Sequence, residues 1–311
     1  MKKTLVLFVT VLLALVLLGG AGKMFFTIAT GGVAGVYYPL GGAMAEIINK
    51  NVPDLNATAV STGASAANIN MLATDEVQMA LVQNDTTYYA YNGIEMFKDK
   101  KQPNLRGIAC LYSETLQLIT ISNTGIKTVY DLKGKRVAVG AAGSGTELNA
   151  RQILEALGLS YKDITPQYLS FAEAANGLRD GNCDVAFITA GVPTAAVRDV
   201  AAQKDVVVVA IPATVADKLI QKYPFYAKFK VPKDTYPKQT ADVDTLAVRA
   251  MLVVNASLDE KVIYEVTKAI FTNQERLVMA HSQGKNIKKE TALEGMPIPL
   301  HPGADRFLKG K

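Results

Sequence analysis

Five short loops rich in Gly, Ser and Thr carry the residue types that could do chemistry in this sequence. The clearest is G-A-A-G-S-G-T, residues 140–146, which follows an apolar run at 137–139 and leads into a helical run to 157. Ser144 and Thr146 stand where a helix N-cap is expected. A strand that ends in such a loop before a helix presents free backbone N–H groups and a partial positive charge. The loop can therefore hold a carboxylate or phosphate without a basic side chain.

The same construction occurs four more times along the chain. Apolar runs lead into G-G-V-A-G-V-Y-Y-P at 31–39, S-T-G-A-S at 61–65, Q-N-D-T-T at 83–87 and T-A-G-V-P-T at 189–194. All five loops fall at predicted strand carboxyl ends, the edge at which open α/β sheets bind ligands. We therefore expect the loops to converge on one small-molecule site. The alternative, that the Ser and Thr residues only cap helices, stays open at this point.

Tyrosine and carboxylate side chains near these loops add possible contacts. Tyr37 and Tyr38 follow the first loop, and adjacent helical residues point about 100° apart, so we expect one to face a ligand and the other to pack. The Asp85 carboxylate could form an ion pair with an ammonium group of a ligand, or it could cap a helix. No arginine lies inside the five loops, so an anion would be held mainly by backbone and hydroxyl donors.

These residues give little evidence for an enzyme. The loops contain neither the Gly-Lys-Ser/Thr ending of a nucleotide phosphate loop nor the Gly-x-Gly-x-x-Gly fingerprint of a dinucleotide fold. The histidines, His281 and His301, lie far from every loop, and neither Ser61 nor Ser144 stands in Gly-x-Ser-x-Gly. We predict a binding protein that uses no cofactor and no metal. An exported serine hydrolase or transferase, and a ligand sensor for a membrane kinase, are the alternatives.

Charge and cysteine content limit the partners. The formal charge of +5 comes from scattered residues without a basic run, so no nucleic-acid partner is expected. Cys110 and Cys183 both lie in apolar runs, which predicts two buried free thiols.

The N-terminus resembles a secretory signal. Lys2 and Lys3 precede the apolar run 5–18 and a small-residue exit at 19–21, and we expect cleavage after Ala21. The run is shorter than a membrane-spanning helix requires, although an uncleaved anchor is the alternative. The mature protein is therefore expected in the periplasm or another extracytoplasmic space.

The order of elements predicts an α/β fold with two lobes built on one plan rather than one large sheet. Separate strands are expected at 106–112 and 116–121, with a crossing between lobes at 113–114 and a return crossing at 246–254. Helices are expected at 38–50, 259–279 and 286–294. The domains are then 1–21 as signal, 22–113 plus 255–311 as lobe A, and 114–254 as lobe B.

Six spaced motifs resemble the solute-binding subunits of TAXI-type TRAP transporters. They are T-G-G-V-A-G-V-Y-Y-P-L-G, S-T-G-A-S-A-A-N, A-L-V-Q-N-D, D-L-K-G-K-R-V-A-V-G-A-A-G-S-G-T-E, F-I-T-A-G-V-P-T and I-P-L-H-P-G-A. The resemblance implies a type II periplasmic-binding-protein fold with a central cleft and a two-strand hinge. It also implies a TRAP membrane permease as partner and a small carboxylate or amino acid, such as glutamate or glutamine, as ligand. A monomer is the default for this architecture. On the matching motifs, the implied ligand-binding residues are Tyr38, Ser61, Thr62, Gly63, Ser65, Gln83, Ser144, Gly145, Thr146, Thr189, Ala190 and Gly191.

Overall fold

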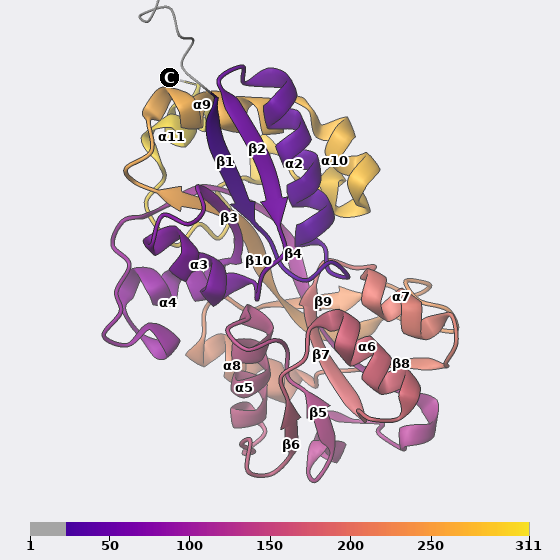
Figure 1. Cartoon of the computed structure of the whole chain (residues 1–311). Coiled ribbons are helices and arrows are strands. Elements are labelled where there is room, and N and C mark those ends of the chain that lie inside the picture. Colours follow the sequence, from indigo (N-terminus) through magenta and orange to yellow (C-terminus); the bar gives the residue numbers. More distant parts are fainter. Residues whose placement is uncertain (1–22, 311) are drawn as a thin grey trace, which may run out of the picture.

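Two lobes, one above the other in Figure 1, make up the part of the chain that the computed structural model describes, residues 23–310. The predicted signal lies outside these residues. Within 23–310, no helix has both the length and the apolar character that crossing a bilayer requires. The mixed α/β, two-lobe architecture agrees with the predicted fold class.

The first lobe is built from three parallel strands and the helices that follow them. Its strand order is β2-β1-β3, and each strand feeds a loop and then a helix. Three C-terminal helices complete this lobe, with α10 packed on α2 and α11 on α9. The elements are β1 (Met24–Ala29), α2 (Tyr37–Asn51), β2 (Leu55–Val60), α3 (Ser65–Ala73), β3 (Met79–Gln83), α4 (Asn84–Asn92), α9 (Glu260–Thr272), α10 (Gln274–Ala280) and α11 (Pro302–Lys309).

The second lobe repeats the plan with the parallel strands β6-β5-β7. Its buried strand β7 has no exposed residue, as expected for a strand covered on both faces. The elements are β5 (Arg136–Ala138), α5 (Gly145–Ala156), β6 (Thr165–Gln167), α6 (Phe171–Asp180), β7 (Val185–Ala190), α7 (Ala195–Ala201), β8 (Val206–Val209), α8 (Ala213–Lys222) and β9 (Ala227–Val231).

Two long antiparallel strands, β4 (Leu105–Ile121) and β10 (Val243–Asn255), run through both lobes. Two expectations are corrected here. The strands predicted at 106–112 and 116–121 are one strand, because Ser113 and Glu114 pair with Arg249 and Val248, and pairing resumes between Cys110 and Met251 after a shift of register. The lobes also share one 10-stranded sheet within the described residues, since β4 and β10 carry the hydrogen bonding across. From Ala250 onward β10 pairs with β3 of the first lobe.

Two helix predictions also need correction. The run 259–279 is two helices, α9 and α10, because the chain leaves helical geometry at Asn273, where φ is −123° and ψ is 41°. The stretch 286–294 forms only a short 3₁₀ turn, η5 (Lys289–Thr291), since tertiary packing overrides its local helix preference. The other 3₁₀ turns are η1 (Glu95–Phe97), η2 (Ser122–Thr124), η3 (Val129–Leu132) and η4 (Ser282–Asn286).

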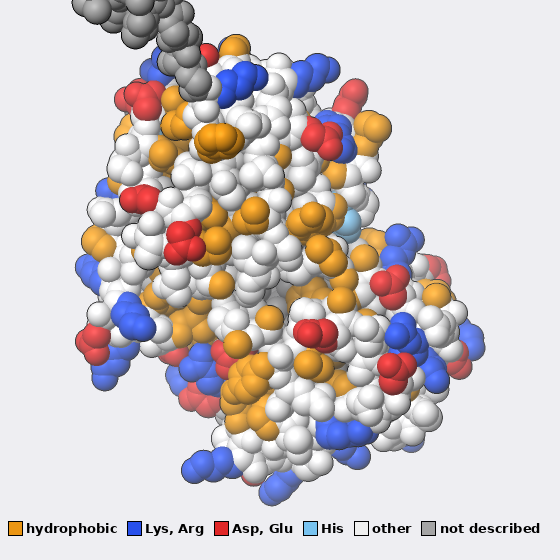
Figure 2. Space-filling model, viewed as in Figure 1, with side chains coloured by type: hydrophobic (Ala, Val, Ile, Leu, Met, Phe, Trp, Pro, Cys, Tyr) orange, Lys and Arg blue, Asp and Glu red, His pale blue; other side chains and the backbone are white. Residues whose placement is uncertain are grey.

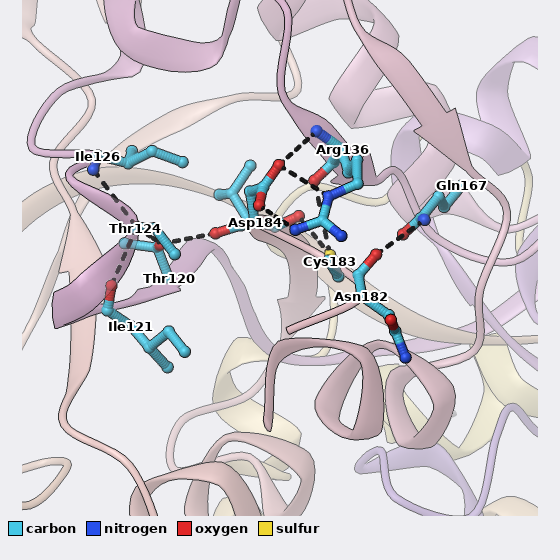
Figure 3. A network of polar contacts seen from close by, with 10 residues as sticks. Thr120, Ile121, Thr124, Ile126, Arg136, Gln167, Asn182, Cys183 and Asp184 are labelled. Atoms are coloured by element: carbon cyan, nitrogen blue, oxygen red, sulfur yellow. Dashed lines mark hydrogen bonds and ion pairs between the residues drawn. The ribbon is translucent and has the colours of Figure 1, made fainter. Parts of the chain in front are cut away.

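The two cysteines are buried and unpaired with each other, which confirms the prediction of free thiols. Cys183 belongs to a polar network at the end of the second lobe away from the first (Figure 3), where Arg136 and Asp184 join β5 to β7. On the face shown in Figure 2, acidic and basic side chains are interspersed, so that face presents no broad area of one sign.

Candidate functional site

The N-cap residues of five helices line one cavity between the lobes. They are Val36, Ala64, Gln83, Ser144 and Ser170, which precede α2, α3, α4, α5 and α6. The cavity offers about 60 Å³ to the centre of a water-sized sphere, enough for roughly four to six water-sized groups. Because a helix N-terminus carries unpaired N–H groups and a partial positive charge, this arrangement favours a small anion.

Local sequence explains how the loops on the second lobe take this shape. The Ser144 hydroxyl accepts a hydrogen bond from Glu147 N at 3.1 Å, so the residue caps α5 and lines the cavity at once. Ser170 and Glu173 form a capping box at the start of α6. Gly140 has φ of 102°, a conformation that L side chains rarely adopt, and it turns the chain between β5 and the loop.

On the first lobe, several of the polar groups serve the scaffold. Thr62 donates to Thr30 O at 3.0 Å, and Asn68 donates to Thr30 O and Leu81 O. The Ser65 hydroxyl accepts from Gln83 N at 3.1 Å. Ala64 has φ of 69° and ψ of −147°, a strained geometry for a residue with a side chain. These contacts fix the loop so that its backbone faces the cavity.

One carboxyl group, Glu114 of β4, is the only acidic or basic side chain in the lining among the described residues. It is 2% exposed, and Tyr37 donates its hydroxyl proton to Glu114 Oε2 at 2.7 Å. Burial raises the pKa of Glu114 well above its usual range, more than the hydrogen bonds from Tyr37 and Gln83 lower it. Burial also raises the pKa of Tyr37, with Glu114 adding to the shift. Both groups therefore favour their neutral forms.

The structure brings most of the predicted site residues together. Thr62, Gly63, Ser65, Gln83, Ser144, Gly145, Thr146, Thr189 and Ala190 all line the cavity. Tyr38, Ser61 and Gly191 do not. Tyr38 is 37% exposed and borders a separate surface hollow with Glu46 and Arg276.

The lining includes polar and aromatic side chains that the predicted set of site residues left out, namely Tyr37, Glu114, Ser170 and Phe171. The helix that begins at Tyr37 buries the Tyr37 ring and leaves the Tyr38 ring exposed. The predicted set contained Tyr38 instead of Tyr37 because the predicted helix phase was wrong by one residue. Glu114 had a detectable signal, since it is one of only two charged residues in the mostly apolar run 105–121. Burying a carboxyl group in a strand costs free energy unless the group is paired, so such a residue indicates a specific role.

Direct contacts close the lobes over the cavity. Ala66 N of α3 donates to Gly143 O at 3.0 Å, and Asn149 Nδ2 of α5 donates to Asp85 Oδ2 of α4 at 2.9 Å. On the opposite side, Gln283 Nε2 donates to Val192 O at 2.6 Å. These bonds join loops of both lobes, so the described conformation is a closed one.

Neither histidine reaches this cavity. His281 Nε2 lies 3.2 Å from Pro193 O, and His301 Nε2 lies 3.0 Å from Leu258 O. Within residues 23–310 the lining therefore holds no imidazole that could activate Ser144 as a nucleophile.

Comparison with known sequences shows which family the chain belongs to. A model of the NMT1-like family matches residues 28–311. The chain belongs to the NMT1-like family. A curated relative, the putative aliphatic sulfonates-binding protein of Escherichia coli (strain K12), is 28% identical over 152 residues, which are 49% of this chain. The match spans 38% of that relative's length.

Solved structures of low sequence identity share the fold. The periplasmic aliphatic sulphonate binding protein SsuA from Escherichia coli is 18% identical with a TM-score of 0.51, over 94% of this chain and 84% of that one. PhnD1 from Prochlorococcus marinus (MIT 9301), solved in complex with methylphosphonate, is 12% identical with a TM-score of 0.55, over 85% and 91%. The curated relative and SsuA are both named as binding proteins, in agreement with the prediction of a non-enzyme.

The predicted membership of the TAXI-type TRAP subunits is wrong on these findings, because the matching family is the NMT1-like family. The glutamate-like carboxylate ligand and the TRAP permease that followed from it are wrong with it. The physical reason lies in the motifs themselves. Loops of Gly, Ser and Thr before helices offer backbone donors to any small oxyanion, so they do not distinguish a carboxylate from a sulfonate or phosphonate.

Proposed function

We propose that the protein is an extracytoplasmic solute-binding protein which captures a small oxyanion of the sulfonate or phosphonate class between its lobes. It delivers this ligand to a membrane permease of the ABC type. The observation that carries the proposal is the convergence of five helix N-termini on one closed cavity whose lining, among the described residues, has no basic side chain. The names of the relatives support the choice of oxyanion.

Ligand contacts follow from the same geometry. The amides at the start of α2 in the first lobe and of α5 and α6 in the second donate to the oxyanion from two sides, while Ala66 N of α3 is already bonded to Gly143 O. Ser65, Ser144, Thr146 and Thr189 add hydroxyl groups, and Tyr37 takes the place that the sequence assigned to Tyr38. Residues 24–113 with 250–309 form the first lobe of this clamp and 114–249 the second, with β4 and β10 as the hinge.

The test is thermal unfolding with defined probes. Methanesulfonate and methylphosphonate carry only the proposed head group and one methyl, so they fit the small cavity. A probe at 100 times its Kd adds about 2.7 kcal/mol to the free energy of unfolding, which raises the Tm by about 5 °C in a protein of this size. L-glutamate serves as the carboxylate control. If neither oxyanion raises the Tm at any pH from 5 to 9, the proposed ligand class is wrong.

A further inference from the structure

A segment of the first lobe holds a loop of the second lobe that forms part of the cavity wall. This loop, residues 189–193, begins with two residues that line the cavity. Gln283 of η4 donates from Nε2 to Val192 O at 2.6 Å, and His281 Nε2 lies 3.2 Å from Pro193 O. The position of the loop therefore depends on two side chains of the other lobe.

The Gln283 side chain is itself fixed in place. Asn286 Nδ2 donates to Gln283 Oε1 at 2.7 Å, which leaves Nε2 to point at the loop. A Cβ built at Gly191 would lie 2.6 Å from Gln283 Cγ, so the side chain and the loop pack without a gap. A shift of Gln283 is therefore passed on to the cavity wall.

Both ring nitrogens of His281 are engaged in this conformation. Nδ1 accepts from Gln283 N at 3.1 Å, so it carries no proton. The proton of the neutral ring is then on Nε2, which donates to Pro193 O. A second proton on Nδ1 would point at the Gln283 N–H, and the ring and Gln283 could not both keep their places. The contact as described therefore requires a neutral His281.

The surroundings of His281 also disfavour the charged ring. Burial is the main cause that lowers the pKa of His281, and Arg198 of α7 lowers it further, although the bond to Pro193 raises it. The other charged side chains on the helices and turns around it are Glu46 and Lys50 of α2, Asp199 of α7, Glu275 and Arg276 of α10, and Lys285 of η4. When the lobes separate, the ring meets water and its pKa returns toward the usual value. Acid therefore favours separated lobes at this contact.

We propose that His281 and Gln283 are positioning residues that hold the 189–193 loop against the ligand, and that protonation of His281 releases this loop and weakens ligand binding in acid. The inference goes beyond the proposed function, because it concerns the closure of the lobes and applies to any ligand of the cavity.

Asp85, at the interlobe contact on the opposite side of the cavity, acts in the other direction. Its pKa in the closed conformation is raised to about 6 by burial, so acid favours closure there. The test therefore compares proteins that share Asp85 and differ at one histidine.

The experiment measures the affinity for methanesulfonate by isothermal titration calorimetry at pH 7.5 and at pH 5. This probe keeps its charge over the whole range. His281→Gln retains an N–H donor for Pro193 O but cannot be protonated. The ratio of its affinity to that of the wild type is expected to rise at least about threefold from pH 7.5 to pH 5, because an exposed imidazole with a pKa of about 6.5 is protonated at pH 5. A ratio that is the same at both pH values overturns the proposal.

His301→Gln is the matched control. His301 Nδ1 accepts from Gly303 N at 3.3 Å and Nε2 lies 3.0 Å from Leu258 O, which is the same pattern inside the first lobe alone. Burial lowers the pKa of His301 as well. His301→Gln is therefore expected to keep the pH dependence of the wild type. If it changes the affinity ratio as His281→Gln does, the contact between the lobes is not the cause and the proposal is overturned.

Small-angle X-ray scattering of the ligand-free proteins tests the contact without a probe. At pH 5 the wild type is expected to have a larger radius of gyration than His281→Gln, whereas the two agree at pH 7.5. Equal radii at both pH values overturn the proposal. If neither methanesulfonate nor methylphosphonate binds, the proposed function fails and the scattering alone decides the inference. Circular dichroism verifies the fold, and His281→Asn replaces His281→Gln if that variant does not fold.

Discussion

At the scale of single residues, Gly145 shows how little space separates the two halves of the cavity. A Cβ at this position would lie 1.9 Å from Gln83 Oε1 and 2.4 Å from its Cδ. Gly145→Ala is therefore expected to push the Gln83 side chain into the cavity and to lower methylphosphonate affinity by about tenfold or more. Isothermal titration calorimetry measures the change.

Gly42 of α2 provides the matched control. A Cβ built there meets nothing within 4 Å. Gly42→Ala is expected to leave the affinity unchanged and to raise the free energy of unfolding by about 0.5–1 kcal/mol, because alanine restricts the unfolded chain. An affinity loss in Gly42→Ala as large as in Gly145→Ala would contradict the steric explanation.

Part of the site could be predicted from residue types and part could not. The Gly-Ser-Gly-Thr loop before α5 lines the cavity as expected, because the link from strand to loop to helix start is local. Which of Tyr37 and Tyr38 turns inward depends on where α2 begins, and that start is set by packing against the sheet. The ligand class could not be read from the loops either, since backbone amides bind any oxyanion.

At the scale of elements, the errors in the predicted boundaries have two sources. β4 continues through Ser113 and Glu114 because a distant strand, β10, pairs with it there, and the local sequence contains no sign of that partner. α9 ends at Asn273 for a local reason. The Asn273 side chain donates to Ala269 O at 2.8 Å, which satisfies a carbonyl at the end of the helix.

The junction of β5 and β7 yields a prediction at this scale (Figure 3). Asp184 accepts from Arg136 N at 2.8 Å and from Nη2 at 2.6 Å, and the side-chain bond to Arg136 is the main cause that lowers the pKa of Asp184. A carboxyl with a lowered folded-state pKa stabilises the protein above its unfolded pKa and loses that effect as pH falls. Asp184→Asn is expected to cost about 1 kcal/mol in urea unfolding at pH 7 and less at pH 3.

The same substitution in a more exposed pair is the control. Asp217 lies 2.6 Å from Lys228, with both side chains about three-fifths exposed. Asp217→Asn is therefore expected to cost less than Asp184→Asn, and neither change should alter methylphosphonate affinity. Equal costs for the two substitutions would show that the backbone bond to Arg136 N contributes nothing.

At the scale of the whole molecule, a buried polar network joins the lobes beside the cavity. Asn149 of α5 donates to Asp85 of α4 at 2.9 Å and to the Tyr226 hydroxyl at 2.9 Å. Burial raises the pKa of Asp85 to about 6, although Thr86 and Asn149 donate to it. The closed conformation therefore favours a protonated Asp85 more than the unfolded chain does.

This shift predicts how stability changes with pH. Because the folded-state pKa of Asp85 lies above the ordinary value of 3.8 for this side chain, the native protein binds more protons between these values, and stability falls as pH rises from about 4 to about 6. The loss amounts to about 3 kcal/mol. Asp85→Asn removes this pH-dependent loss. Between pH 4 and pH 7, the free energy of unfolding of the variant in urea is therefore expected to rise by about 3 kcal/mol relative to that of the wild type.

Asp54→Asn, the same change at an exposed side chain, controls for the lost charge. A constant difference between wild type and Asp85→Asn over this pH range would mean that Asp85 has an ordinary pKa in the folded protein.

The path of the chain through the shared sheet sets an order of assembly during synthesis. Strands β4 to β9 and the part of β10 that pairs within the second lobe have been made once the chain reaches residue 249. The first lobe has its strands β1, β2 and β3 early, yet β3 gains its β10 neighbour only when residues 250–254 follow. A nascent chain that stops near residue 249 thus holds a finished second lobe and an unfinished first one. The half made first is the last to become protease-resistant.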